Sequence, residues 1–140
     1  MSGLLSGGCL CGAVRFKAKP EADEIGACHC SMCRKWSGGV FLGVTVDADV
    51  EFESETALGV YSASEWGERV FCKTCGSSLI WRAKDGFHTT IAAGAFDPPA
   101  DFQLVSEIFI EEKPQGYAFA NETKQMTGAE VFALFAPKQD

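Results

Sequence analysis

The residues best suited to chemistry in this 140-residue chain are its seven cysteines, which occur in three short groups. The groups are Cys9 and Cys11, then Cys28, Cys30 and Cys33, and finally Cys72 and Cys75. No cysteine of the sequence lies outside them. Isolated core cysteines would not be spaced so tightly, and clustered cysteines in a reducing compartment bind metal more often than they form disulfides. The spacing therefore predicts metal binding.

Zinc is the metal that this ligand set favours. A structural Zn²⁺ takes four ligands in a tetrahedron, and a Cys-x₂-Cys turn presents two sulfurs on one side. Gly12 and Gly76 each follow the last cysteine of a group, where a residue with positive φ turns backbone amides toward sulfur. Seven thiols cannot fill two four-thiolate sites. If the chain binds two zinc ions, one has three protein sulfurs and a free position, which is the arrangement of a catalytic zinc.

Spacing alone leaves the pairing of the groups open. In one arrangement the first and last groups close a four-thiolate site across adjacent strands, and the middle group forms a three-thiolate site on one loop. In a rival arrangement Cys30 and Cys33 join the last group as a zinc ribbon, and the other cysteines stay free. A redox-active pair at Cys30 and Cys33 is a third interpretation.

The two histidines are not expected to bind metal, and most of the three tryptophans are not expected to bind ligand. His29 lies between two cysteines, and on an extended backbone its ring points away from their sulfurs. His88 begins a strand-like stretch and is expected to be a packed or surface residue. For at least two of Trp36, Trp66 and Trp81 we expect core packing rather than a place in a ligand cleft.

Charge excludes several classes of partner. The chain has 12 basic and 19 acidic residues and a net charge of -7, which repels nucleic acids and anionic membranes. Arg34, Lys35, Arg69 and Lys73 lie close to cysteines in sequence, and together they would form a pocket for a small anionic ligand. No run approaches the roughly 20 apolar residues of a membrane span, and no signal peptide is recognisable. We expect a cytoplasmic protein, either a monomer or a homodimer, without nucleic-acid or membrane partners.

The elements that must position the cysteines are mostly short strands. Two-residue alternation and turn-forming residues predict strands at residues 13–18, 40–46, 51–52, 57–61, 68–71, 78–81, 88–92 and 106–110. A short helix is expected at residues 31–36. Thr127 and Glu130 form a capping box ahead of a C-terminal helix that ends at Pro137. The length suits a single domain, residues 1–140, that is mainly β with several small antiparallel sheets.

The sequence blocks around the cysteines resemble the glutathione-dependent formaldehyde-activating (GFA) family, also named for centromere protein V. The similarity runs from Gly8 to about Ile110 and includes Ala93-Gly94-Ala95-Phe96-Asp97. The blocks are Gly8-Cys9-Leu10-Cys11-Gly12, Cys28-His29-Cys30-Ser31-Met32-Cys33-Arg34-Lys35 and Arg69-Val70-Phe71-Cys72-Lys73-Thr74-Cys75-Gly76-Ser77. The sequence differs from the family pattern at Glu107, where His is usual, and at Tyr117, where Trp is common. Both differences bear on the glutathione site rather than on the zinc sites.

The resemblance implies a β-tent fold of small sheets around zinc knuckles and two zinc ions per chain. It implies a structural zinc at Cys9, Cys11, Cys72 and Cys75, and a catalytic zinc at Cys28, Cys30 and Cys33. The family's namesake reaction joins formaldehyde and glutathione into S-hydroxymethylglutathione, and in reverse it is a carbon-sulfur lyase reaction.

We therefore expect a zinc-dependent carbon-sulfur lyase whose partners are a small thiol such as glutathione and a small aldehyde. Arg34 or Lys35 is expected to bind a substrate carboxylate. The alternative is a non-catalytic zinc-binding module that binds a partner protein or carries a thiol adduct. Such a module would present an exposed apolar patch, whereas an enzyme would present a cleft ending at the three-cysteine site.

Overall fold

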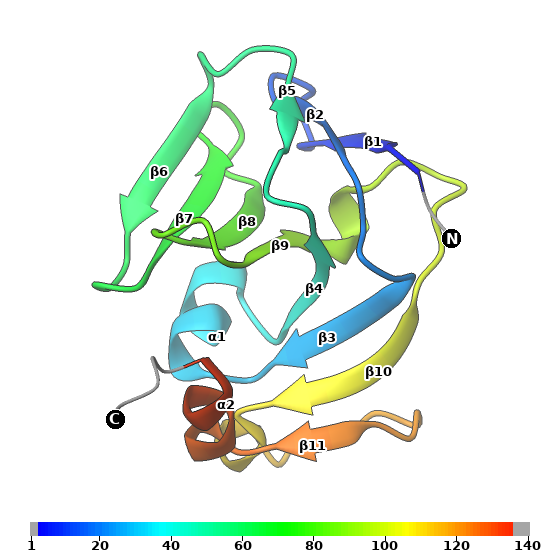
Figure 1. Cartoon of the computed structure of the whole chain (residues 1–140), viewed down its shortest axis with the longest axis vertical. Helices are drawn as coiled ribbons and strands as arrows, with labels where there is room; N and C mark the ends of the chain where they lie inside the picture. Colours follow the sequence, from blue (N-terminus) through cyan, green and yellow to red (C-terminus); the bar gives the residue numbers. More distant parts are fainter. Residues whose placement is uncertain (1–2, 136–140) are drawn as a thin grey trace.

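A computed structural model describes residues 3–135 of the chain, which form two β-sheets, two α-helices and two short 3-10 helices. The small sheet has the strand order β1-β2-β5, and the eight-stranded sheet has the order β11-β10-β3-β4-β9-β8-β7-β6 (Figure 1). The strands are β1 (Leu5–Gly8), β2 (Arg15–Ala18), β3 (Glu24–Cys28), β4 (Phe41–Val46), β5 (Glu51–Phe52), β6 (Leu58–Ser62), β7 (Gly67–Cys72), β8 (Ser78–Ala83), β9 (Thr89–Ala92), β10 (Gln103–Ile108) and β11 (Lys124–Met126). The prediction of a mainly β protein is confirmed.

Most strand pairs are antiparallel, as expected, but β10 pairs in parallel with both β3 and β11. This pairing places Ile108 opposite Cys28. The strand predicted at residues 106–110 ends at Ile108, because Phe109 has left-handed backbone angles (φ 56°, ψ 45°) and a 3-10 helix follows at Ile110–Glu112. Strands β1, β3 and β11 were not predicted. Their short sequences lack a clear alternation of apolar residues, and pairing with neighbouring strands orders them.

Both predicted helices are confirmed. Helix α1 (Ser31–Ser37) ends at Gly38, whose φ of 84° allows a left-handed cap. Helix α2 (Gly128–Phe135) begins with the expected capping box: Thr127 N–H donates to Glu130 Oε1 at 2.7 Å, and Glu130 N–H donates to Thr127 Oγ1 at 3.1 Å. The predicted stop at Pro137 lies outside the described residues. Within residues 3–135, neither helix has the length and apolar character that crossing a membrane requires.

The hydrophobic core lies between the small sheet and the central strands of the large one. Its largest fully buried side chains are Phe16, Leu79, Ile80 and Ile91. The ring of Phe96 packs edge-on against Phe16 at 5.5 Å between ring centroids. Val14, Val70 and Cys72 belong to the same cluster. Since Cys72 ends β7 and Val14 lies just before β2, the core fixes the chain beside the first and last cysteine groups.

Gly7 in β1 lies where no side chain fits, which gives a test of this packing. A Cβ atom at Gly7 would lie 2.4 Å from the Ala95 carbonyl oxygen and 2.5 Å from the Phe16 ring. Gly7→Ala should lower the free energy of unfolding by about 1–3 kcal/mol, as overpacking of a core does. Gly116→Ala is the control, because nothing lies within 4 Å of a Cβ atom there. Urea denaturation of both variants measures the effect, and equal midpoints would contradict the packing.

Candidate functional site

The structure gathers the seven cysteines into two clusters, and all seven thiols are free. The first cluster joins the first and last groups of the sequence, and the second is the middle group alone. Within each cluster the sulfur atoms lie within 4.8 Å of one another. The four-cysteine cluster comprises Cys9, Cys11, Cys72 and Cys75, and the three-cysteine cluster comprises Cys28, Cys30 and Cys33. Of the arrangements that the spacing left open, the chain adopts the first and not the zinc ribbon.

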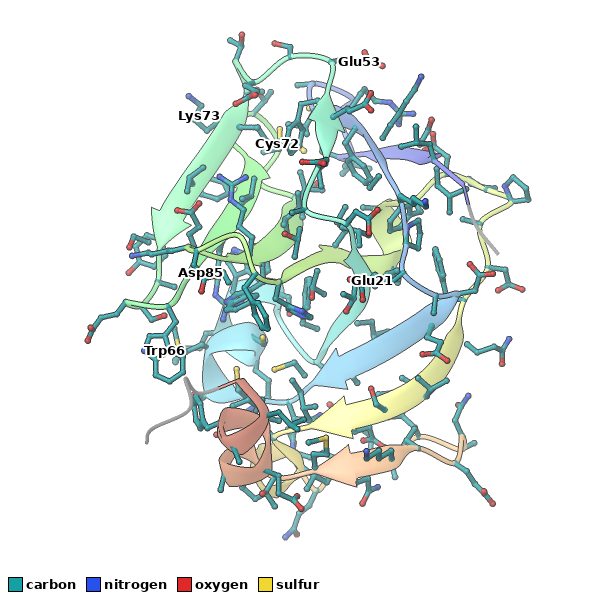
Figure 2. The ribbon with its side chains drawn as sticks, viewed as in Figure 1. Glu21, Glu53, Trp66, Cys72, Lys73 and Asp85 are labelled. Carbon is teal, nitrogen blue, oxygen red and sulfur yellow. The ribbon has the colours of Figure 1, made fainter. Side chains whose placement is uncertain are left out.

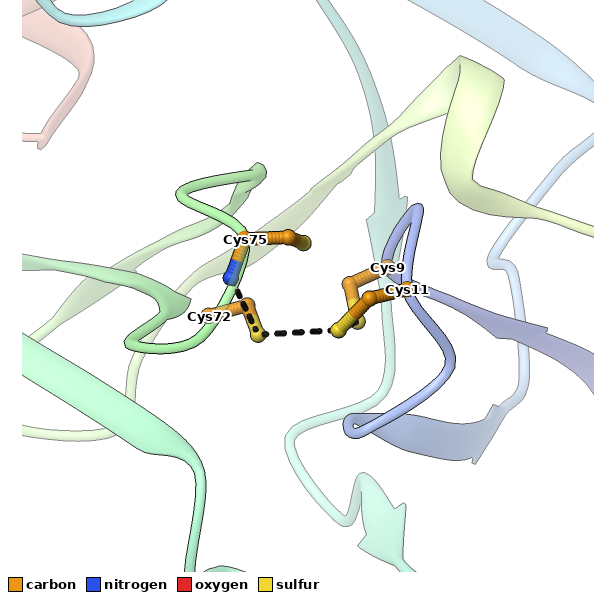
Figure 3. Close-up of side chains that lie close together, drawn as sticks. All are labelled: Cys9, Cys11, Cys72 and Cys75. Carbon is orange, nitrogen blue, oxygen red and sulfur yellow. Dashed lines mark hydrogen bonds between the residues drawn. The ribbon is translucent and has the colours of Figure 1, made fainter.

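The four-cysteine cluster is built by two loops that face each other (Figure 3). One loop follows β1, and the other is the turn between β7 and β8. The Cys11 sulfur lies 3.7 Å from that of Cys9 and 3.9 Å from that of Cys72. Four sulfurs at about 2.3 Å from a tetrahedral zinc ion are about 3.8 Å apart. The spacing of these sulfurs is therefore compatible with zinc.

Backbone amides surround the sulfurs of this cluster. The Val14 N–H donates to Cys9 Sγ at 3.3 Å. The N–H groups of Thr74 and Cys75 donate to Cys72 Sγ at 3.3 and 3.4 Å. Hydrogen bonds to sulfur favour the thiolate over the thiol, and the thiolate is the form that binds metal. The backbone amides of the two loops thus stabilise the thiolate forms of Cys9 and Cys72, which can bind a cation.

Two glycines and a serine complete these loops. Gly12 and Gly76 have φ angles of 86° and 83°, as expected for residues that close such turns. The Ser77 hydroxyl lies 3.2 Å from Cys75 Sγ. Its hydrogen bond is the largest of the effects that lower the pKa of Cys75 to about 5. The Ser77 hydroxyl thus favours the thiolate form of Cys75.

The three-cysteine cluster lies where β3 passes into α1. Cys28 ends β3, Cys30 is the N-cap residue of α1, and Cys33 lies in the first turn of that helix. The Cys33 N–H donates to Cys30 Sγ at 3.3 Å, so the sulfur occupies the place of a capping oxygen. Cys33 is buried and the other two are partly buried. Three thiolates leave one position of a tetrahedral ion free.

The thiols of this cluster have pKa values shifted in opposite directions. Hydrogen bonds from Cys28 and Cys33 lower the pKa of Cys30 to about 2. Hydrogen bonding to Cys30, together with burial, raises the pKa of Cys28 far above its ordinary value. Metal binding to these cysteines must displace the thiol protons that remain. The donor set of each cluster could hold a metal ion and is compatible with zinc.

A buried pair of polar side chains fixes the loop that carries the three cysteines. His29 is fully buried, and its Nε2 lies 2.8 Å from Glu107 Oε1. The Thr123 hydroxyl donates to the other Glu107 oxygen at 2.5 Å. Burial raises the pKa of Glu107, but hydrogen bonds from Thr123, His29 and Gln125 outweigh it and hold this pKa below its ordinary value. Glu107 is thus an anion that holds the buried ring of His29, which is not part of the three-cysteine cluster.

The backbone of His29 is held as well. Its N–H donates to the Ile108 carbonyl oxygen at 3.1 Å, and the Arg34 Nε donates to its carbonyl oxygen at 2.9 Å. The other histidine belongs to neither cluster: His88 Nε2 lies 3.0 Å from the Thr90 hydroxyl, and its ring packs against Trp81. In this loop the three sulfurs form one cluster, and the ring of the intervening His29 is bound instead to Glu107.

The basic residues near the cysteines do not form one pocket. Arg34 and Lys35 line a surface hollow of about 500 Å³ beside α1, whose lining includes Ser31 and Tyr117 but none of the three cysteines. Arg69 is buried, and its Nη1 lies 3.6 Å from Cys33 Sγ. Lys73 lies beside Cys72, well away from α1 (Figure 2). Of the four basic residues expected to form a pocket for an anionic ligand, only Arg34 and Lys35 therefore line the same hollow.

Comparison with known proteins identifies the family. A family model described as glutathione-dependent formaldehyde-activating enzyme matches residues 4–112. The chain belongs to this GFA family. The matched residues include both cysteine clusters and Glu107.

Relatives and a solved structure agree with GFA membership. An uncharacterised lyase of Schizosaccharomyces pombe is 32% identical over 126 residues, covering 89% of this chain and 92% of that protein. A Halomonas elongata protein named after the same GFA enzymes is 35% identical over 124 residues, covering 79% of this chain and 78% of that protein. The crystal structure of a Rhodobacter sphaeroides protein superposes with a TM-score of 0.58 at 21% identity, covering 72% of this chain and all of that one. This last likeness shows the fold alone.

Two residues that contact the three-cysteine loop were missed or undervalued by sequence reasoning. Glu107 was noted only as a difference from the family pattern, and Arg69 only as one of four basic residues near cysteines. A charged residue at an inward position of an apolar strand is a detectable signal, since such a group needs a buried partner. The partners, His29 and Cys33, are 78 and 36 residues away and could not be assigned without the fold.

The anchoring role of Glu107 gives a prediction about stability. Glu107→Ala leaves the buried His29 ring without its partner, so the free energy of unfolding should fall by about 1–3 kcal/mol. Glu122→Ala is the control, because Glu122 is exposed in the same stretch of chain. Denaturant unfolding of the zinc-loaded proteins measures both. Glu107 would not be an anchor if the two variants unfolded at the same denaturant concentration.

Proposed function

We propose that this chain is a zinc-dependent carbon-sulfur lyase that acts on a thiol-aldehyde adduct such as S-hydroxymethylglutathione. In this proposal Cys9, Cys11, Cys72 and Cys75 hold a structural zinc ion, and Cys28, Cys30 and Cys33 hold a catalytic one. The observation that carries the proposal is the difference between four and three sulfurs in two clusters of one chain. Membership of a family named for formaldehyde activation supports the substrate class.

The two clusters suit different tasks. Four thiolates complete the tetrahedral shell of a zinc ion, so a metal bound there has no position for substrate and serves to tie two loops together. Three thiolates leave a position that a substrate atom can take. The chemistry also needs reduced thiols, which agrees with a cytoplasmic protein.

The proposed reaction is an addition to a carbonyl group and its reversal. The glutathione thiolate sulfur forms a bond to the carbonyl carbon of formaldehyde, the carbonyl π electrons move to oxygen, and that oxygen takes a proton. In the lyase direction the hydroxyl loses this proton, the carbon-sulfur bond breaks, and its electron pair returns to sulfur. Zinc, when bound, supplies a Lewis acid at its free position. The protein residues place the two reactants side by side.

The hollow beside α1 supports the assignment of the thiol. Arg34 and Lys35 offer two positive charges there, next to the loop of the three cysteines. Glutathione carries two carboxylates, and guanidinium and ammonium groups bind carboxylates by charge-assisted hydrogen bonds. The Nε of Arg34 is engaged with the His29 carbonyl, so its terminal nitrogens are the donors available to substrate. Tyr117 forms part of the same wall.

A second candidate function is a module that binds a partner protein through an apolar surface. Trp66 and Phe132 are 54% and 46% exposed, and their rings pack together at 5.2 Å between centroids. Leu134, on the same helix as Phe132, is also exposed. An exposed apolar patch of this kind is typical of interaction surfaces. The two functions differ in whether the protein accelerates adduct formation or breakdown.

Replacing a sulfur of the open site tests the proposal. Cys30→Ser should release one zinc ion per chain and reduce adduct formation from formaldehyde and glutathione to the enzyme-free rate, because the fourth position is lost with the metal. Met32→Ala is the matched control, since Met32 is exposed in the same turn and outside the cluster. Zinc analysis and a formaldehyde-glutathione assay against an enzyme-free blank give the readout. Full acceleration by Cys30→Ser would refute the assignment, and a wild type with two zinc ions but no acceleration would favour the binding module.

A further inference from the structure

Arg69 is a buried cation that faces a sulfur of the three-cysteine cluster. Only 4% of the residue is exposed, and its Nη1 lies 3.6 Å from Cys33 Sγ. The central carbon of its guanidinium lies 5.0 Å from the centroid of the Trp36 ring, in a cation-π contact. Arg69 belongs to β7, whereas Cys33 and Trp36 belong to α1. The guanidinium therefore joins two separate elements directly at the site.

Burial of a guanidinium is costly unless a negative group compensates it. Arg15 and Arg82, both partly exposed, have carboxylate partners in Asp97 and Glu68. Among residues 3–135, by contrast, no carboxylate lies within ion-pair distance of Arg69. The negative charge available to Arg69 in this part of the chain is that of the cysteine sulfurs.

The charge of the metal-loaded site matches that of Arg69. Three thiolates and one Zn²⁺ ion carry one net negative charge, and one guanidinium carries one positive charge. We propose that Arg69 is the charge-balancing residue of the three-cysteine site, which retains zinc there and favours an anionic substrate thiolate at the free position. This inference rests on the proposed function, because it requires zinc on these three cysteines.

The four-cysteine cluster shows why only one site needs such a residue. Cys72 is buried there, but Cys11 is exposed, and Cys9 and Cys75 are partly exposed. Water and the backbone amides around its sulfurs can stabilise the excess negative charge. In the other cluster Cys33 is buried, and one of its contacts is the guanidinium. The three-cysteine set has no exposed member, so an internal cation contributes more to its charge balance.

The charge of Arg69 also affects which ligand can take the fourth position on a zinc ion held by the three cysteines. With zinc held by the three cysteines, a substrate thiolate at the free position would bring the group to two negative charges, of which Arg69 would compensate one. A neutral ligand such as water gains no comparable stabilisation. Arg69 therefore lowers the electrostatic cost of binding an anionic thiol at a site that is largely out of water. This makes Arg69 a determinant of specificity for thiolates rather than for neutral ligands.

Zinc retention in three variants tests the role of the charge. Arg69→Met removes the charge and keeps an apolar chain of similar length, Arg69→Lys keeps the charge, and Arg82→Met removes a partly exposed arginine from the neighbouring strand β8. The measurement is zinc transfer from the reduced, zinc-loaded proteins to a chromophoric chelator. Arg69→Met should hold the weaker of the two zinc ions about 10- to 100-fold less tightly, as outer-shell substitutions do. Arg69→Lys should stay close to wild type, and Arg82→Met should be unchanged.

The outcomes show whether the role of Arg69 fails alone or together with the proposed function. A wild type with two zinc ions, together with an Arg69→Met variant of equal affinity, would overturn the role of Arg69 and leave the proposed function standing. A wild type with a single zinc ion would contradict the proposed function and the inference with it. If Arg69→Met does not fold, the comparison of Arg69→Gln with Arg69→Lys replaces it, and equal zinc affinities in that pair would refute the charge argument. A purely structural role would lower the unfolding midpoint without separating charged from uncharged variants.

Discussion

Sulfur atoms held within 4.8 Å of one another repel each other as thiolates, and a bound divalent cation removes that repulsion. The fold brings cysteine sulfurs together at two places. Loops at the ends of β1 and β7 bring four sulfurs together, and the junction of β3 with α1 brings three. Backbone amides, a serine hydroxyl and a buried guanidinium then lower the cost of the negative charge. Metal occupancy and the stability of these loops are therefore expected to depend on each other.

The two clusters differ in the means by which the surrounding protein tolerates charge. The exposed four-cysteine cluster relies on water and on amides oriented by tight turns at Gly12 and Gly76. The three-cysteine cluster is more deeply placed, and buried side chains hold it from two sides. Arg69 approaches its sulfurs, and Glu107 anchors the opposite side of the loop through His29.

The sequence predicted much of this architecture, because cysteine spacing and apolar alternation are local signals. The two helices, the capping box at Thr127 and most strands follow from such patterns. The parallel pairing of β10 with β3 could not be predicted, since the two strands are far apart in sequence and neither carries a pattern that specifies its partner or register. For the same reason the contacts of Glu107 and Arg69 were not assigned. The strand predicted at residues 106–110 extends two residues past the end of β10, because the left-handed Phe109 carries no glycine-like sequence signal.

The number of zinc ions bound to each intact chain tests the account most directly. Native mass spectrometry of the reduced protein, after removal of free metal, measures that number without reference to any substrate. The account predicts two zinc ions per chain, one for each cysteine cluster. A chain that retains one zinc ion or none after reconstitution with excess zinc would contradict it.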